Sequence, residues 1–282
     1  MTHEVNADPP EPQGSRIPAL RLLCNLGWQF LGSHDRLQQC GGTRQVLLIP
    51  RLIEVLQTRR FEYKGEWVPL SPSGIDQIVR ELSALDLAHG LLRANERLYN
   101  KLLLGIAITE FMPDGKRHQP TIAVIDWSEQ GTTTNRFDVA EGLEVLSAQG
   151  THSLISDIVC YVNGIPLAMI EAQRPGTASA RKATGKATGK ATVEEGISRH
   201  LRNQRHDQAP HLFAYAQLLL AIGHGEARYG TTGTAAKFWA RWREEEFSDA
   251  QMSAWKNLSL DAGTHAALFT NKPTAARKYF ER

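Results

Sequence analysis

Two acidic residues stand at the outer ends of two apolar runs that a short turn joins. Asp157 precedes the core of the first run, Glu171 closes the second, and Gln173 follows two residues later. Neighbouring carboxylates repel each other, and a hard divalent cation with oxygen ligands relieves that repulsion. We therefore expect Mg²⁺ to bind Asp157 and Glu171, with the backbone carbonyl of Ala172 and substrate phosphate as further ligands. Such an ion polarises a phosphoryl oxygen and generates hydroxide for in-line attack.

This chemistry requires the two acids to share one face of a sheet. Asn163 and Gly164 accept positive φ at little cost, so they predict a tight turn between two strands. A regular hairpin with a two-residue loop would place Glu171 on the opposite face from Asp157. A three-residue loop, or a β-bulge near Pro166, would bring both acids to the same face. In the alternative interpretation, the acids are solvated residues at the strand ends.

Helical spacing of apolar residues predicts that the first hundred residues are mostly helical. The pattern covers residues 16–31, 44–57 and 71–85. In the last of these segments Ser73 and Asp76 have the spacing of a capping box, with Asp in place of the usual Glu or Gln. From residue 101 onward, short β-branched runs separated by Gly, Pro, Asn and Asp predict a sheet.

The second half of the chain returns to alternating helices and strands. Residues 193–205 predict a helix, residues 211–223 a buried strand, and residues 234–247 an aromatic amphipathic helix. We therefore expect an α/β fold. The predicted organisation is a disordered tail at 1–15, a mostly helical part at 16–100, an α/β core at 101–247 with a low-complexity insertion at 177–192, and a C-terminal helical tail at 248–282.

The composition excludes several classes of protein. The chain has 282 residues, with 32 Lys and Arg against 30 Asp and Glu, and its net charge of +2 gives no strong overall field for a polyanion. Cys24, Cys40 and Cys160 form no CxxC motif, which argues against a disulfide framework and a zinc site. No apolar run is long enough to cross a bilayer, and the acidic, proline-rich first residues do not resemble a signal peptide. We expect a cytoplasmic protein.

A tetrapeptide repeat, KATGKATGKAT, occupies residues 182–192. It has no large apolar residue, so we expect a solvated insertion between a strand and a helix. In the alternative interpretation, Lys182 and Lys186 belong to a basic loop that contacts phosphates. The repeat imitates a P-loop but lacks the glycine and the Ser or Thr that the motif requires, so it does not predict ATP binding.

The segment SDIVCYVNGIPLAMIEAQRP, residues 156–175, resembles the nuclease motif of the R (motor) subunit of type I restriction endonucleases, a branch of the PD-(D/E)XK nuclease superfamily. That motif has an aspartate, an apolar strand, an Asn-Gly turn and a strand that ends in Glu-x-Lys. Further stretches resemble the same N-terminal region, including ANERLYNKLLLGIAI, NRFDV, RNQRHDQAPHLFAYAQLLLAI and RYGTTGTAAKFW.

The resemblance implies a nuclease-like core sheet flanked by helices and Mg²⁺-dependent cleavage of double-stranded DNA. It also implies partners, namely the methyltransferase and specificity subunits of a type I restriction complex. In this family an ATP-driven translocase follows along the polypeptide. The present sequence has no helicase motifs, so we expect a nuclease-like domain whose C-terminal tail leads toward an absent translocase.

The resemblance also assigns roles to residues. Asp157 and Glu171 match the metal-binding acids, whereas Gln173 stands where the family has lysine. A neutral amide stabilises developing negative charge less well than an ammonium group, so we expect cleavage to be impaired. The alternative is a catalytically silent module that keeps the fold and its role in DNA binding or assembly.

A second family motif, Gln-x-x-x-Tyr, falls on Arg199 and Asn203, which differ from both motif residues. Arg199 could return the missing positive charge, because its helix would direct it toward the same edge of the sheet. A third acid on a preceding helix has two candidates, Glu81 and Glu96. The residues expected to contact DNA are Arg174, Lys182, Lys186, Arg199 and Asn203.

Overall fold

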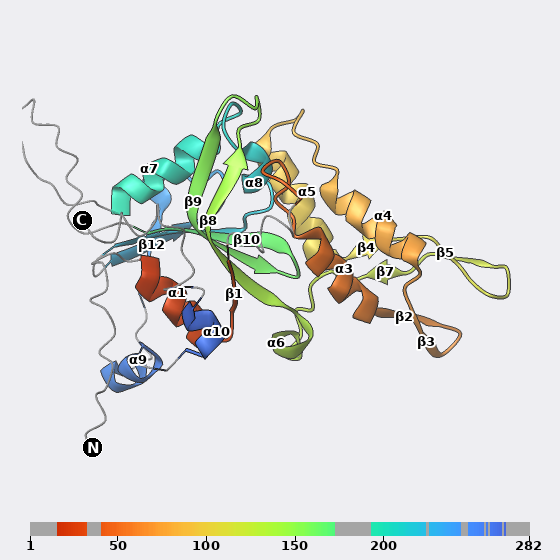
Figure 1. The fold of residues 1–282 in the computed structure, drawn as a ribbon. Coiled ribbons are helices and arrows are strands. Elements are labelled where there is room, and N and C mark those ends of the chain that lie inside the picture. Colours follow the sequence, from red (N-terminus) through yellow and green to blue (C-terminus); the bar gives the residue numbers. More distant parts are fainter. Residues whose placement is uncertain are drawn as a thin grey trace, which may run out of the picture.

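The computed structural model describes residues 16–32, 41–172, 193–223, 226–243, 248–256, 258, 260–266 and 268. In these residues a seven-stranded mixed sheet forms the centre of the fold, with the strand order β1-β8-β9-β10-β11-β12-β13 (Figure 1). The strands of this sheet are β1 (Gln29–Leu31), β8 (Phe137–Leu146), β9 (Ser153–Val162), β10 (Ile165–Ala172), β11 (Leu218–Gly223), β12 (Glu226–Gly230) and β13 (Ala240–Arg241). Strand pairs β1–β8 and β10–β11 are parallel, and the other pairs are antiparallel.

Three two-stranded ladders accompany the main sheet. They are formed by β2 (Arg60–Tyr63) with β3 (Glu66–Pro69), β4 (Ile106–Ala107) with β7 (Thr121–Ile122), and β5 (Glu110–Phe111) with β6 (Arg117–His118). The helices are α1 (Arg16–Asn25), α3 (Ile49–Thr58), α4 (Pro72–Ser83), α5 (Leu91–Leu104), α6 (Gly131–Thr134), α7 (Val193–Asn203), α8 (Pro210–Phe213), α9 (Asp249–Lys256) and α10 (Ala262–His265). The predicted α/β fold, a sheet flanked by helices, is confirmed.

Helices cover both faces of the main sheet (Figure 1). Helix α1 packs against β8 and β9 from one side, and α7 packs against β10 and β11 from the other. Helix α7 lies in the connection between the parallel strands β10 and β11, which cannot be joined by a tight turn. This connection places the middle of α7 above the ends of two adjacent strands.

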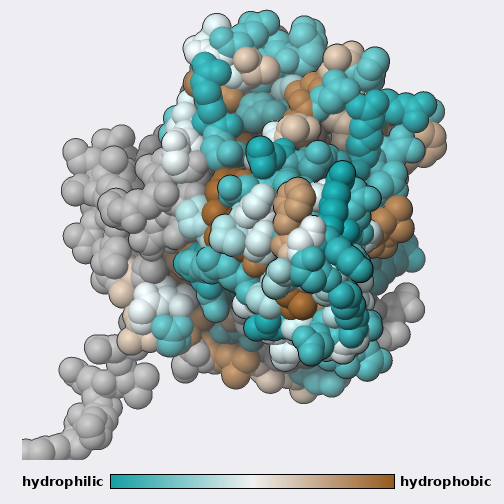
Figure 2. Space-filling view, turned by 90° about the vertical axis from the view of Figure 1, so that its right-hand side faces the viewer, coloured by the Kyte–Doolittle hydropathy of each residue, from teal (hydrophilic) through white to brown (hydrophobic). Residues whose placement is uncertain are grey.

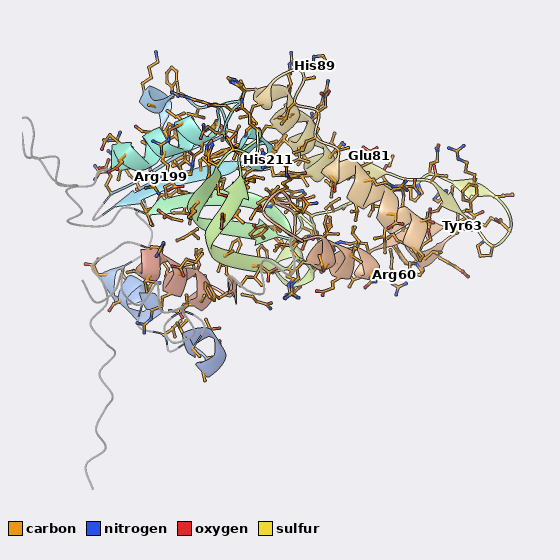
Figure 3. All side chains as sticks on the ribbon, turned by 45° about the horizontal axis from the view of Figure 1, so that its top comes forward. Arg60, Tyr63, Glu81, His89, Arg199 and His211 are labelled. Carbon is orange, nitrogen blue, oxygen red and sulfur yellow. The ribbon has the colours of Figure 1, made fainter. Side chains whose placement is uncertain are left out.

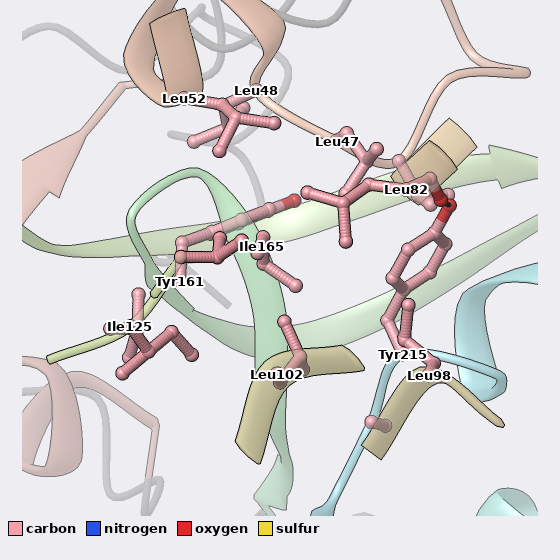
Figure 4. Close-up of a cluster of buried hydrophobic side chains, with 14 of the residues drawn as sticks. Leu47, Leu48, Leu52, Leu82, Leu98, Leu102, Ile125, Tyr161, Ile165 and Tyr215 are labelled. Atoms are coloured by element: carbon pink, nitrogen blue, oxygen red, sulfur yellow. Dashed lines mark hydrogen bonds between the residues drawn. The ribbon is translucent and has the colours of Figure 1, made fainter. Parts of the chain in front are cut away.

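The larger hydrophobic core lies between the sheet and helices α3, α4, α5 and α7. Tyr161 and Tyr215 are among its largest fully buried side chains (Figure 4). The Tyr215 hydroxyl donates a hydrogen bond to the Leu82 carbonyl at 2.8 Å, so its polar end is satisfied inside the core. A second cluster lies under α1, and its buried residues are Ile17, Leu20, Val139, Ile158, Cys160, Ile170 and Leu268.

The part of the molecule that carries α3, α4 and the β2–β3 hairpin extends away from α7 (Figure 1). Its outer face is mainly hydrophilic, with apolar side chains scattered singly (Figure 2). Single exposed apolar side chains are normal on a protein surface. Among the helices of the described residues, none combines the length and the apolarity that a membrane span requires.

Three of the predicted helices differ from the observed ones at their ends, and the one predicted for 44–57 begins only at Ile49. Helix α4 begins at Pro72, and Ser71 caps it by accepting a hydrogen bond from the Gly74 amide at 3.0 Å, so the predicted cap at Ser73 is wrong. The helix predicted for 16–31 ends at Asn25, because Gln29–Leu31 pair with β8 as strand β1.

The aromatic helix predicted for 234–247 is wrong in the part that the structure describes. Residues Ala236–Phe238 form one 3₁₀ turn, and β13 follows directly. The Trp242 amide donates to the Ala227 carbonyl at 2.8 Å, which extends the contact with β12. Trp239 is buried and belongs to the larger hydrophobic core. The strand predicted for 211–223 begins only at Leu218, after the short helix α8.

Candidate active site

The predicted turn between β9 and β10 is present and has two residues. Asn163 and Gly164 have φ values of 53° and 81°, and Val162 pairs with Ile165. Asn163 is fully buried, and its side chain holds the turn in place. Its Nδ2 donates to the Val124 carbonyl and its Oδ1 accepts from the Arg136 amide, at 2.8 and 2.7 Å.

A β-bulge follows the turn and sets the register of the acids. The pairing of β9 and β10 shifts by one residue between Pro166 and Ala168. Beyond the shift the pairs continue to Ile170 opposite Ile158. One further step places Glu171 directly opposite Asp157, and such residues lie on the same face of a sheet. The predicted bulge near Pro166 is therefore confirmed, and the regular register is excluded.

Arg199 from α7 bridges the two carboxylates. Its Nη1 donates to Glu171 Oε2 at 2.7 Å and to Asp157 Oδ2 at 3.4 Å. The Ala172 amide donates to the same Asp157 Oδ2 at 3.1 Å, which fixes the orientation of that carboxylate. The expectation that Arg199 reaches this edge of the sheet is confirmed, and Figure 3 shows the residue on α7.

Asp157 is also approached from the α1 side. The β8–β9 ladder is interrupted at Gly142, which has a φ of 62° and falls opposite Asp157. Arg16 of α1 places Nη1 3.9 Å from Asp157 Oδ1, and its Nη2 lies 3.0 Å from Glu141 Oε1. Two arginines from opposite faces therefore contact one aspartate.

Glu171 has the most unusual environment in the site. Its side chain is 0% exposed, whereas that of Asp157 is 16% exposed. Burial raises the pKa of Glu171 to about 8, and the nearby charge of Asp157 adds to the rise, while Arg199 opposes it. Glu171 Oε1 is buried and has no hydrogen-bond partner among the described residues. A buried carboxylate oxygen without a partner is costly, and an added cation would remove that cost.

The donor set therefore fits a hard divalent cation. Asp157 and Glu171 offer carboxylate oxygens only, and Mg²⁺ commonly binds through one or two carboxylates, with water and phosphate as its other ligands. No cluster of three or more His, Cys, Asp or Glu side chains suited to a metal occurs in the described residues. The two candidate ligands, Asp157 and Glu171, are both carboxylates, which suit hard cations better than metals that prefer sulfur or nitrogen ligands.

Several predicted site residues lie outside the described part of the chain. They are Gln173, Arg174, Lys182 and Lys186, together with the rest of the tetrapeptide repeat. Asn203 is described and lies one helical turn beyond Arg199 in α7, with a 4% exposed side chain.

The two candidates for a third acid lie elsewhere. Glu81 contacts Lys101 at 2.9 Å on the exposed side of α4, and Glu96 contacts Arg93 at 3.0 Å on α5. Figure 3 shows Glu81 well separated from Arg199. Sequence reasoning missed Arg16 and Glu141, which form an ion pair at 3.0 Å on the α1 side of the sheet, next to Asp157. No local pattern marks these two residues, because Arg16 reaches Asp157 through the packing of α1, and Glu141 lies near it through the pairing of β8 with β9.

An α/β sheet flanked by helices, with two acids at facing positions of adjacent strands, is compatible with a nuclease-like fold. The family described as the type I restriction enzyme R protein N terminus (HSDR_N) matches residues 11–238. The chain belongs to this family, which confirms the resemblance seen in the sequence.

A curated relative is the type I restriction enzyme HindI endonuclease subunit of Haemophilus influenzae. It is 26% identical over 166 residues, which cover 57% of this chain and 15% of the relative. The chain thus matches a small part of that subunit's length.

Proposed function

We propose that this chain is the DNA-cleaving domain of a type I restriction R subunit and hydrolyses phosphodiester bonds of double-stranded DNA with Mg²⁺. The observation that carries the proposal is the convergence of Asp157 and Glu171 on one face of the sheet, with Glu171 Oε1 buried and unpartnered in the described residues. Family membership supports the same activity. In the cell the domain would act in the cytoplasm with methyltransferase and specificity subunits.

In this proposal the two carboxylates hold the ion. The Ala172 amide keeps Asp157 oriented toward Glu171, and the Ala172 carbonyl is a further candidate ligand. When bound, Mg²⁺ supplies charge that polarises the phosphoryl oxygen and lowers the pKa of a water. Arg174, Lys182, Lys186 and Arg199 remain the proposed contacts to DNA, whereas Asn203, at 4% exposed, is too buried to be one.

Gln173 would limit the rate. Its amide can donate a hydrogen bond to a developing negative charge but carries no charge of its own. Loss of one preorganised stabiliser of this kind lowers a rate by about 10² to 10³-fold. Slow nicking is therefore the expected basal activity.

A catalytically silent DNA-binding or assembly module is the second candidate. The observation that favours it is the salt bridge of Arg199 to both acids, which neutralises much of the charge that would attract a metal.

Nicking of supercoiled plasmid with and without Mg²⁺ separates the two candidates. We expect Gln173→Lys to nick about 10² to 10³-fold faster than the parent chain, and Asp157→Ala to be inactive. Arg202→Gln serves as a control for an exposed substitution on α7 that should leave nicking unchanged. If no form nicks DNA and calorimetry detects no Mg²⁺ binding, only the silent module remains.

A further inference from the structure

Arg199 lies where a cation shared by Asp157 and Glu171 would be expected. A single nitrogen, Nη1, contacts both carboxylates, at 2.7 and 3.4 Å. The strongest arginine–carboxylate pairs use two nitrogens against one carboxylate. Here the guanidinium instead divides its charge between two acids.

Burial explains why the acids hold this cation. Glu171 is fully buried and Asp157 is 16% exposed, and ionising both adjacent acids in such surroundings requires a positive neighbour. Arg16 cannot supply it for both acids, because its contact with Asp157 is 3.9 Å long and its shorter contact, at 3.0 Å, is with Glu141.

Arg199 also has an alternative partner on its own helix. Its side chain is 32% exposed, and Glu195 stands one turn earlier in α7 and interacts electrostatically with it. Glutamate four residues before a basic residue is the favourable order for a helical ion pair. Glu195 is exposed, so a side chain that pairs with it leaves the sheet edge.

We propose that Arg199 is the resident counter-ion of the acid pair and competes with the divalent cation for Asp157 and Glu171. Metal binding then requires the guanidinium to leave the carboxylates and turn toward Glu195. This inference rests on the proposed metal site and assigns to Arg199 the control of metal loading. If Arg199 occupies the pair nine-tenths of the time, the apparent metal affinity is about tenfold weaker than the intrinsic one.

Binding of Mn²⁺, followed by electron paramagnetic resonance without DNA, tests the competition. We expect Arg199→Gln to bind Mn²⁺ about tenfold more tightly than the parent chain. Arg202→Gln removes the same charge from an exposed position one turn away and should leave the affinity within about twofold, because solvent screens it. Circular dichroism establishes that each variant is folded.

A second pair of variants tests the alternative partner with exposed positions that should not disturb folding. Glu195→Gln leaves Arg199 without its partner on α7, so we expect Mn²⁺ affinity to fall about threefold. Glu194→Gln removes the same charge from the neighbouring residue, whose carboxylate lies 3.3 Å from Arg228, and should have little effect.

The outcomes separate the inference from the proposed function. If the parent binds Mn²⁺ and Arg199→Gln binds it with equal or lower affinity, the competition is overturned and the proposed metal site stands. Equal effects of the Glu195 and Glu194 substitutions also count against it. Absence of Mn²⁺ binding in folded parent and folded Arg199→Gln overturns both the inference and the proposed metal site.

Discussion

His200 stacks on Trp239, with ring centroids 5.5 Å apart and an angle of 27° between the ring planes. Its Nε2 lies 2.9 Å from the Leu220 carbonyl, and because a carbonyl only accepts, Nε2 carries the proton. The contact ties α7 to β11 immediately beside Arg199. The neutral, buried histidine thus helps to hold α7, and with it the backbone of Arg199, against the sheet.

Acidification should destabilise the protein through His200. Burial lowers the pKa of His200 from 6.5 to about 4, so between these values the unfolded chain binds a proton that the folded chain excludes. Stability from this group is complete above pH 6.5 and is lost as the pH falls toward 4. We expect this group to contribute a loss of about 1 kcal/mol between pH 7 and pH 5.5. Glu171, whose pKa is raised to about 8, contributes in the opposite direction over the same interval, so the difference between the parent and His200→Phe isolates the histidine. Urea unfolding at both pH values measures it.

The control for this effect is a pair of variants. His200→Phe keeps a ring against Trp239 but cannot titrate, so its stability should change about 1 kcal/mol less over the same pH interval. His206→Gln removes an exposed histidine and should follow the parent. If the free energies of unfolding of the parent and of His200→Phe change equally with pH, the lowered pKa of His200 is contradicted.

Gly164→Ala should destabilise the fold strongly. A Cβ at this position would lie 2.5 Å from the Leu48 carbonyl, and the Leu48 amide donates to the Gly164 carbonyl at 2.8 Å. Backbone atoms cannot make room as a flexible side chain does, so the turn would have to leave the start of α3. We expect a loss of about 3 kcal/mol in the free energy of unfolding, measured in urea.

Gly115→Ala provides the matched comparison for that substitution. Gly115 has a φ of 77°, similar to that of Gly164, but nothing lies within 4 Å of its Cβ position. Gly115→Ala should lower the free energy of unfolding only by the strain of a positive φ, about 1 kcal/mol. Equal losses in the two variants would show that the close approach to Leu48 is unimportant.

Asn163→Gly should separate hydrogen bonding from backbone strain. Glycine accepts the φ of 53° but removes the bonds to Val124, Asn135 and Arg136. We expect a loss of about 3 kcal/mol, because each lost bond is worth about 1 kcal/mol and buried partners remain unsatisfied. Asn163→Ala should lose about 1 kcal/mol more through strain. A loss below 1 kcal/mol in Asn163→Gly would mean that the side chain does not organise the turn.

The sequence was informative where structure is local. The Asn163-Gly164 turn and the alternation of the strands restricted the hairpin to two registers, and the bulge near Pro166 followed from requiring both acids on one face. Ser71 could have been identified as the α4 cap, because Pro72 at the first helical position is a recognised start signal.

Tertiary pairing decided the features that the sequence did not predict. The aromatic spacing around Trp239 favours a helix locally, yet the chain there gains a strand partner in β12 and buries the indole against His200. Arg16 and Glu141 are more than a hundred residues apart. The pairing of β8 with β9 brings Glu141 beside Asp157, and the packing of α1 on β8 brings Arg16 to both acids. The periodicity of apolar residues carries no information about which distant residues come into contact.

Strand β1 covers one side of β8 with three residues contributed from far earlier in the chain. Without that cover, one long rim of β8 would present bare amide and carbonyl groups to solvent. Unprotected rims of this kind recruit strands from other molecules and lead to aggregation. A truncated form that starts after residue 32 should therefore lose solubility before it loses its acid pair, so a soluble recombinant domain must retain this early segment.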